Sequence, residues 1–136
     1  MPNFQQITPE QMWGPMGGPK NRWNDALLNA ERLRGTKLYI STSTGLAGRQ
    51  DQVSYLVGEA GVPEVAAGIA ATTLQVEGGA IEAAINQCSH DLRAKLEGLN
   101  IPAHYEFRNA GTHSWGYWRQ DIKKAWYTTI APAFGM

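Results

Sequence analysis

Apolar and polar residues recur with two different periods along the chain, and these periods predict two strands and two long helices. Residues 37–42 are rich in β-forming side chains, and residues 104–108 alternate apolar with polar positions, so both segments are predicted strands. Apolar residues at helical spacing predict a helix that begins at Gly78-Gly79 and a second, final helix after the second strand. The first apolar stripe contains Ile81, Ile85, Cys88, Leu92, Leu96 and Leu99, and the second contains Trp118, Ile122, Ala125 or Trp126, Ile130 and Phe134.

The remaining segments have weaker patterns. Residues 1–23 are rich in Pro, Gly and Trp, which predicts irregular structure. Asn24 or Asp25 can cap a short helix that ends near Arg34, before Gly35.

Residues 46–77 combine Val, Ala and Gly with little periodicity, and Pro63 interrupts them. They fit an insertion or flap, within which residues 65–71 are either a short helix or an apolar loop. A connection of this length in a small domain usually serves function or is partly disordered.

Helices that alternate with strands predict an α/β fold with a parallel sheet. Only two strands are evident, however, and a parallel sheet normally has several strands with both faces covered. The interpretation is a single partial domain over residues 1–136, the end of a larger α/β domain with an incomplete sheet. The exposed edge of such a sheet is expected to cause dimerisation, aggregation or a molten state.

Charge and cysteine content exclude several classes of function. Twelve basic residues balance twelve acidic ones, which argues against nucleic acid or an anionic membrane as a partner. The small basic cluster around Lys123, interrupted by Asp121, is interpreted as a solvated helix face. The single cysteine, Cys88, forms no intrachain disulfide and has no zinc-ligand spacing around it, so a buried thiol is predicted, with no metal and no cofactor. The chain shows neither a signal peptide nor a membrane span, and by itself predicts a cytoplasmic location.

The segment with the clearest chemical potential is the turn Gly111-Thr112-His113, which precedes the last helix. Ligands of α/β sheets collect at the carboxyl ends of the strands, and aromatic residues flank this histidine. His113 is therefore a candidate acid–base residue, with a turn histidine bonded to nearby backbone as the alternative. His90 is expected on a helix surface, and His104 opens the second strand.

A catalytic histidine needs a carboxylate to hold its tautomer, and in α/β-hydrolases that acid precedes the histidine in the chain. Glu82, 31 positions before His113, is the first candidate; it could equally be a first-turn acid favoured by a helix dipole. Glu77 and Glu106 are the rivals. No Gly-x-Ser-x-Gly nucleophile motif occurs in the chain.

Four segments together resemble the C-terminal half of the trehalose mycolyltransferases, which are secreted α/β-hydrolase-fold acyltransferases of the mycolic-acid envelope. The resemblance covers about residues 10–134, and its most specific part is the last segment. The segments are Met12-Trp13-Gly14-Pro15, Trp23-Asn24-Asp25, Leu38-Tyr39-Ile40 and Gly111-Thr112-His113-Ser114-Trp115-Gly116-Tyr117-Trp118.

The resemblance implies the C-terminal part of an α/β-hydrolase fold in which His113 is the catalytic base and Glu82 is its acid. Ser114 and Trp115 are implied to bind substrate. The implied partners are an acyl-trehalose or other acyl ester and a sugar acceptor. The catalytic serine would lie in an N-terminal half outside this chain, which is therefore expected to be inactive alone. Family resemblance also implies a secreted or cell-envelope location.

Two alternative functions remain open. One is a segment of a generic carboxylesterase of the same fold. The other is a non-catalytic module that binds a sugar or lipid, or that pairs with a separate N-terminal chain or a second copy of itself. Trp115 and Trp118 suit stacking on a sugar ring as well as packing in a core.

Overall fold

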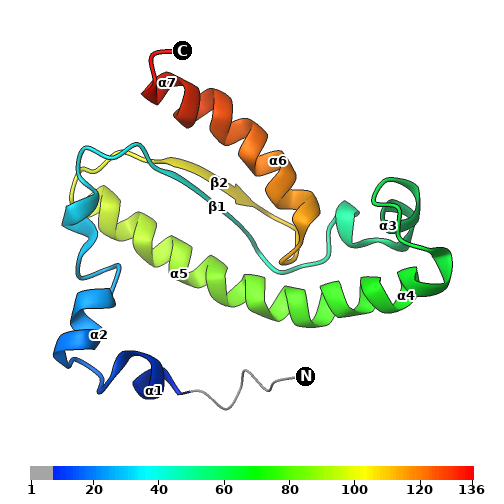
Figure 1. Cartoon of the computed structure of the whole chain (residues 1–136), viewed down its shortest axis with the longest axis horizontal. Helices are drawn as coiled ribbons and strands as arrows, with labels where there is room; N and C mark the ends of the chain where they lie inside the picture. Colours follow the sequence, from blue (N-terminus) through cyan, green and yellow to red (C-terminus); the bar gives the residue numbers. More distant parts are fainter. Residues whose placement is uncertain (1–7) are drawn as a thin grey trace.

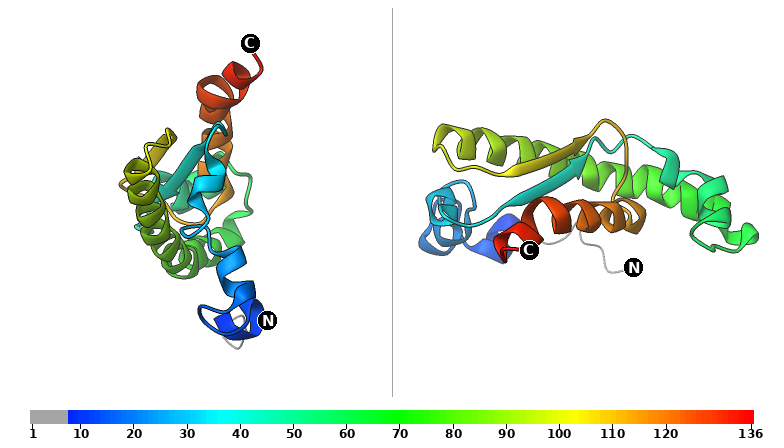
Figure 2. Two further views of the ribbon diagram at one scale, coloured as in Figure 1. Left: turned by 90° about the vertical axis from the view of Figure 1, so that its left-hand side faces the viewer. Right: turned by 90° about the horizontal axis from the view of Figure 1, so that it is seen from above.

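Two parallel strands and the helices on either face of them organise the molecule. The structure, a computed structural model, describes residues 8–136. Strand β1 (Tyr39–Ser43) pairs in parallel with β2 (His104–Arg108), with Tyr39 opposite His104 and Ser43 opposite Arg108. Helices α5 and α6 lie on opposite faces of this sheet (Figure 2). The predicted mixed α/β architecture with a parallel sheet is therefore confirmed for the described residues.

The described part of the chain contains thirteen elements in the order shown in Figure 1. The labels η2 and η3 denote 3₁₀ turns, and η4 and η5 denote π-helical turns. The bounds are α1 Pro9–Trp13, α2 Pro19–Asn24, η2 Ala30–Leu33, β1 Tyr39–Ser43, η3 Arg49–Asp51, α3 Val53–Gly58, α4 Glu64–Thr73, η4 Leu74–Gly78, α5 Gly79–Gly98, β2 His104–Arg108, α6 Trp115–Ala125, η5 Trp126–Ile130 and α7 Ala131–Ala133.

The N-terminal region is more helical than its composition predicts. Of residues 1–23, the first seven lie outside the described residues, and the rest contain most of two short helices. Helix α1 begins with a capping box, in which the Thr8 backbone N–H donates to the Gln11 side chain at 2.8 Å and the Gln11 N–H donates to the Thr8 hydroxyl. Irregular structure was thus the wrong prediction here, because a proline at the first helical position favours a helix start.

The helix expected between residues 24 and 34 is reduced to separate turns. Asp25 does act as a cap, since its carboxylate accepts the N–H groups of Leu27 and Leu28. Only the short η2 follows, and it ends before Gly35, whose φ of 84° suits glycine.

Residues 46–77 are mostly helical rather than an irregular loop. Of the two alternatives for residues 65–71, the helix is observed, as α4. Figure 1 shows α4 running through η4 directly into α5. The predicted start at Gly78-Gly79 coincides with the start of α5, yet the backbone is already helical there. The two glycines instead allow a close approach, because a Cβ on Gly79 would lie 2.7 Å from the Gly45 carbonyl oxygen.

In the first half of α5, the face turned toward the strands is offset by one residue from the predicted stripe, whereas Leu92, Leu96 and Leu99 farther along the stripe pack in the core as predicted. Ile81 and Ile85 are 49% and 36% exposed, whereas Glu82 is 3% exposed. Leu96 is the one fully buried member of the stripe and packs with Ala30 and Ile101. The apolar spacing predicted the wrong inward face there, because the buried Glu82 carboxylate, and not an apolar side chain of the stripe, faces the end of β1.

The last helical region is confirmed in extent, but its buried face also differs from the prediction. Tyr117, Asp121 and Ala125 are buried, whereas Ile122 and Phe134 are 57% and 77% exposed. Asp121 forms an ion pair with Arg108 and does not belong to a solvated face. A buried ion pair and a buried tyrosine therefore decide which side of α6 faces the sheet.

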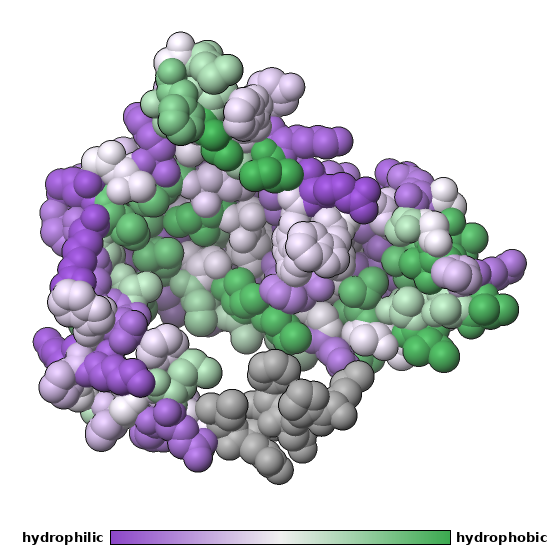
Figure 3. All heavy atoms as spheres, in the orientation of Figure 1, coloured by the Kyte–Doolittle hydropathy of each residue, from purple (hydrophilic) through white to green (hydrophobic). Residues whose placement is uncertain are grey.

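Apolar side chains also gather on the surface. Figure 3 shows them over the end of the molecule that carries α3 and α4, and over the C-terminal end near α7. The residues concerned include Val65, Ile69, Phe134 and Met136, all more than 70% exposed. No helix among residues 8–136 combines the length and apolarity needed to cross a membrane.

Cys88 is exposed, which makes the prediction of a buried thiol wrong. The offset of α5 places it on the outer side of the helix. We expect an aromatic disulfide reagent to titrate one thiol in the native chain about as fast as in denaturant, with Cys88→Ser as the blank. A thiol that reacts only after denaturation would contradict this arrangement.

Candidate active site

His113 lies in a loop between β2 and α6, at the carboxyl ends of both strands. Backbone hydrogen bonds fix this loop: Gly45 N–H donates to Gly111 O at 3.0 Å, and His113 N–H donates to Gly78 O at 3.1 Å. Gly111 has a φ of 135°, and a Cβ there would lie 2.6 Å from the Ser43 hydroxyl, so only glycine fits. The loop thus joins both strands to the π-helical turn η4, a kind of irregularity often found at functional sites.

The Glu82 side chain, on α5, contacts the His113 ring, although 31 residues separate the two in the chain. Its Oε2 lies 3.0 Å from His113 Nδ1. Its Oε1 accepts the Ser43 backbone N–H at 2.7 Å and the Thr42 hydroxyl at 3.2 Å. One carboxylate oxygen therefore binds the end of β1, and the other is left for the histidine.

The helix-dipole explanation of Glu82 does not apply. A first-turn acid is stabilised by unpaired N–H groups at a helix start. Here α4 and η4 precede α5 without a break, so the residues before Glu82 are already helical. The buried Glu82 carboxylate has its hydrogen-bond partners in Ser43, Thr42 and His113 instead.

This geometry assigns different roles to the two ring nitrogens of His113. A neutral imidazole that donates its Nδ1 hydrogen to Glu82 carries its lone pair on Nε2. The His113 side chain is 35% exposed, against 4% for that of Glu82. A partly accessible imidazole held by a buried carboxylate is the geometry that the acid–base half of a catalytic triad requires.

Aromatic rings and a cavity of about 230 Å³ surround the accessible side of His113. The Trp118 ring contacts the imidazole edge-on, with ring centroids 4.6 Å apart, and Trp115 contacts Trp118 in the same way at 5.0 Å. Ser114 and Trp115, both predicted from the sequence, line this cavity together with His113. The other lining residues are Gln50, Tyr55, Leu56, Ala60, Leu74, Gly116, Trp118 and Arg119.

The rival residues lie elsewhere. Glu77 is exposed, and Glu106 pairs with Lys124 at 2.5 Å. His90 is exposed, as expected, and packs against Phe107, while His104 stacks on Tyr39. Within residues 8–136, His113 is the histidine that contacts a carboxylate.

A second buried carboxylate, Asp51, holds the His113 loop and was missed by the sequence analysis. It is completely buried and accepts the Thr112 hydroxyl at 2.6 Å, the Tyr117 hydroxyl at 2.9 Å and the Gly48 N–H at 2.8 Å. Burial and the bond to Asp51 raise the pKa of the Tyr117 phenol well above its usual value. Asp51 therefore ties η3, the loop and α6 together.

Nothing in the sequence pattern distinguishes Asp51. It lies in the polar run Arg49-Gln50-Asp51-Gln52, which has the composition of a solvated turn. Only the fold shows that Gln50 and Asp51 point inward while their neighbours remain exposed.

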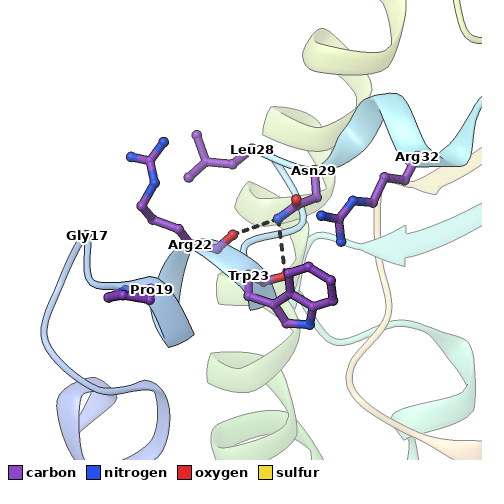
Figure 4. A pocket seen from close by; sticks show the side chains of 7 residues that line it. All are labelled: Gly17, Pro19, Arg22, Trp23, Leu28, Asn29 and Arg32. Carbon is purple, nitrogen blue, oxygen red and sulfur yellow. Dashed lines mark hydrogen bonds between the residues drawn. The ribbon is translucent and has the colours of Figure 1, made fainter.

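A separate cavity of about 550 Å³ lies beside α2 (Figure 4), and it shares no lining residue with the cavity beside His113. The Asn29 amide donates to the carbonyl oxygens of Arg22 and Trp23, and the Arg32 guanidinium lies 4.4 Å from the Trp23 ring centroid. Arg22, Trp23 and Arg32 are exposed, and the lining contains no acid–base pair. This cavity is not the candidate active site.

No set of three or more His, Cys, Asp or Glu side chains within the described residues is arranged to hold a metal ion. Comparison with known proteins finds no matching family model and no matching curated protein. The case for a function therefore depends on the geometry around His113.

Proposed function

We propose that His113 and Glu82 are the base and the acid of a serine-type acyltransferase or esterase, and that the nucleophilic serine comes from polypeptide outside these 136 residues. The observation that carries this proposal is the buried Glu82 carboxylate, divided between the end of β1 and His113 Nδ1. Such a division holds the imidazole in one orientation and one tautomer. Among residues 8–136, no hydroxyl or thiol forms a hydrogen bond with His113 Nε2 that would make it the nucleophile.

The proposed chemistry begins when an incoming serine hydroxyl attacks the carbonyl of an acyl ester. His113 Nε2 takes the serine proton, and Glu82 stabilises the resulting imidazolium. The tetrahedral intermediate collapses to an acyl-enzyme, and His113 returns the proton to the departing alcohol. A second hydroxyl, deprotonated by His113, then attacks the acyl-enzyme and takes the acyl group; water in its place gives hydrolysis.

The resemblance to the trehalose mycolyltransferases supports a more specific substrate: a mycolyl or other long acyl group, transferred to trehalose or another cell-wall sugar. It also supports a secreted or cell-envelope location. A generic carboxylesterase has the same catalytic residues. Long branched acyl donors with trehalose as acceptor favour the first proposal, whereas preference for short esters and water favours the second.

The architecture supports a larger α/β-hydrolase fold of which these residues are the C-terminal part. Within the described residues each strand has only one neighbour, so β1 and β2 each leave one edge unpaired. Ile81 and Ile85 are also exposed on α5. A serine-bearing N-terminal half, or a second copy of this chain, is the proposed cover for these surfaces.

The 136-residue chain alone is expected to show no serine-type turnover of p-nitrophenyl esters, because no hydroxyl or thiol of residues 8–136 is hydrogen-bonded to His113 Nε2. Turnover by pure chain that disappears in His113→Ala, but persists in the surface variant His90→Ala, would contradict the proposal.

One observation favours a non-catalytic module as the second candidate. Trp115 lines the cavity beside His113 and is 75% exposed, which suits stacking against a sugar ring. Saturable quenching of tryptophan fluorescence by trehalose would support this module if the native protein, including any serine-bearing half, showed no turnover.

A further inference from the structure

Two arginines beside an exposed tryptophan have no acidic partner within the described residues. Arg22 lies in the last turn of α2, Arg32 lies in η2, and both line the cavity of about 550 Å³ together with Trp23. Four other arginines of the chain form ion pairs with carboxylates, whereas within residues 8–136 no carboxylate pairs with Arg22 or Arg32. These two guanidinium groups are therefore available to an anionic partner.

The acidic residues close to this cavity are engaged elsewhere. Glu31 pairs with Arg34, and the Asp25 carboxylate accepts two backbone N–H groups. Residues 14–37 contain five basic and two acidic residues, although the charge of the whole chain is balanced. The cavity thus lies in a locally positive part of the molecule, which attracts an acidic partner.

The two arginines point to different sides of the cavity. Figure 4 shows the Arg32 guanidinium above the Trp23 ring, 4.4 Å from the ring centroid, and the Arg22 guanidinium directed away from it. Stacking on the indole uses the face of the Arg32 guanidinium and leaves its N–H groups free to bind a carboxylate. Because the two guanidinium groups diverge, they suit two acidic groups on either side of an apolar group better than one compact ion.

The backbone beneath these side chains is held in place by Asn29. Its amide donates to the carbonyl oxygens of Arg22 at 2.7 Å, Trp23 at 3.2 Å and Asp25 at 2.7 Å. These bonds join the end of α2 to the residue that precedes η2 (Figure 4). The Arg22 and Trp23 backbone is therefore fixed before a partner binds, which lowers the entropic cost of binding.

The exposure of this cavity favours a polypeptide over a small molecule. A small-molecule site buries most of its ligand, whereas Arg22, Trp23 and Arg32 are all exposed, Trp23 by 67%. Tryptophan and arginine are also the residue types that contribute most to binding between proteins. Nucleic acid suits the surface less well, because the charge of the whole chain is balanced.

A second copy of this chain does not supply an acidic segment, because no two of its twelve acidic residues lie closer than five positions apart in the sequence. The three side chains also belong to neither of the unpaired strand edges for which a serine-bearing half is the proposed cover. Figure 2 shows α1 and α2 extending beyond the layers formed by α5, the sheet and α6. These observations favour a separate protein as the partner.

We propose that Arg22, Trp23 and Arg32 bind an acidic segment of a separate protein. Two carboxylates of that segment pair with the two arginines, and an apolar side chain between them packs on Trp23. This binding surface is independent of the proposed catalysis, since it shares no lining residue with the cavity beside His113.

The experiment titrates a fluorescein-labelled peptide, Glu-Glu-Leu-Glu-Glu, with the native gene product and follows fluorescence anisotropy at low salt. We expect saturable binding that is about fivefold weaker in Arg22→Gln and in Arg32→Gln, the upper end for an exposed ion pair. Trp23→Ala is expected to weaken it about tenfold. All three side chains are exposed, so the unfolding midpoint is expected to stay unchanged.

Arg119→Gln is the matched control, because it removes the same charge from an exposed arginine that lines the other cavity. It is expected to bind the peptide as the wild type does. Raising the ionic strength is expected to weaken binding, because the ion pairs are exposed to solvent.

The inference would be overturned by the absence of saturable binding, by equal binding of Gln-Gln-Leu-Gln-Gln, or by unchanged affinity in Arg22→Gln and Arg32→Gln. Tighter binding of a short oligothymidylate would overturn it in favour of nucleic acid. Binding by the 136-residue chain but not by a longer native product would also overturn it, since the rest of that product would then cover the surface. None of these results concerns His113, so the proposed function is tested separately.

Discussion

Replacing Asp51 with alanine is expected to lower the free energy of unfolding by about 2–4 kcal/mol, a large fraction of the stability of a small domain. The substitution leaves the Thr112 and Tyr117 hydroxyls and the Gly48 N–H without their acceptor in a fully buried site. Equilibrium urea unfolding, monitored by circular dichroism, measures the change.

Asp25 provides the matched control for this prediction. It also accepts two backbone N–H groups, but its surroundings are exposed, so Asp25→Ala is expected to cost only about 1 kcal/mol. Equal effects of Asp51→Ala and Asp25→Ala would contradict the role given to Asp51.

Two further variants distinguish the roles of the two hydroxyl groups that donate hydrogen bonds to Asp51. Thr112→Val removes the bond to the residue beside His113, whereas Tyr117→Phe removes the bond to α6. Because Thr112 belongs to the His113 loop, only Thr112→Val is expected to change the NMR signals of the His113 imidazole. Equal perturbation of His113 by both variants would show that Asp51 stabilises the fold without positioning the loop.

In a protein that includes the serine-bearing part, Glu82→Gln is expected to reduce the rate of acyl transfer by about 10⁴-fold, the size of effect known for the equivalent change in a serine-protease triad. The Ser43 N–H requires an oxygen acceptor, so the new amide would turn its NH₂ group toward His113 Nδ1. Nδ1 would then accept a hydrogen bond, and the ring proton would move to Nε2. The histidine would lose the lone pair with which it acts as a base.

Glu106→Gln is the control, since the partner of the Glu106 carboxylate within residues 8–136 is the exposed Lys124 side chain. The measurement is kcat and KM for an acyl donor with trehalose as acceptor. A Glu82→Gln variant that retains activity within about tenfold of the wild type would contradict the base–acid assignment.

The sequence predicted the parts of the fold that depend on local pattern. The strands at 104–108 and near 37–42 have strong β-forming or alternating composition, and both were found. Gly98, Asn100 and Pro102 are residue types typical of a helix end, and α5 stops at Gly98, with Asn100 at a φ of 53°. These features follow from local composition and backbone preference alone.

The wrong inward faces predicted for α5 and α6 have one physical cause: buried polar side chains lie where the pattern predicted apolar ones. Glu82 and Asp121 occupy the inward faces of α5 and α6, so apolar periodicity selected the neighbouring residues. The predicted stripes therefore contain exposed residues such as Ile85 and Ile122. Periodicity detects only apolar burial, and a paired carboxylate is invisible to it.

The candidate site was partly predictable for a different reason. The sequence indicated His113 as a candidate because it lies in a Gly-Thr-His turn flanked by aromatic residues. It indicated Glu82 because this acid precedes the histidine in the chain, as in α/β-hydrolases, and because of the resemblance to the trehalose mycolyltransferases. Asp51 and Gln50 had no comparable signal, because their inward orientation depends on contacts with Thr112 and Gly116, about sixty residues away in the chain.

The most direct test of the account is to label the native gene product with a fluorophosphonate and to locate the modified residue by mass spectrometry. The account predicts a modified serine outside residues 1–136, and loss of labelling when His113→Gln is introduced. A native product that contains only these residues and resists labelling, or labelling that persists in His113→Gln, would contradict the proposal that His113 and Glu82 activate a serine.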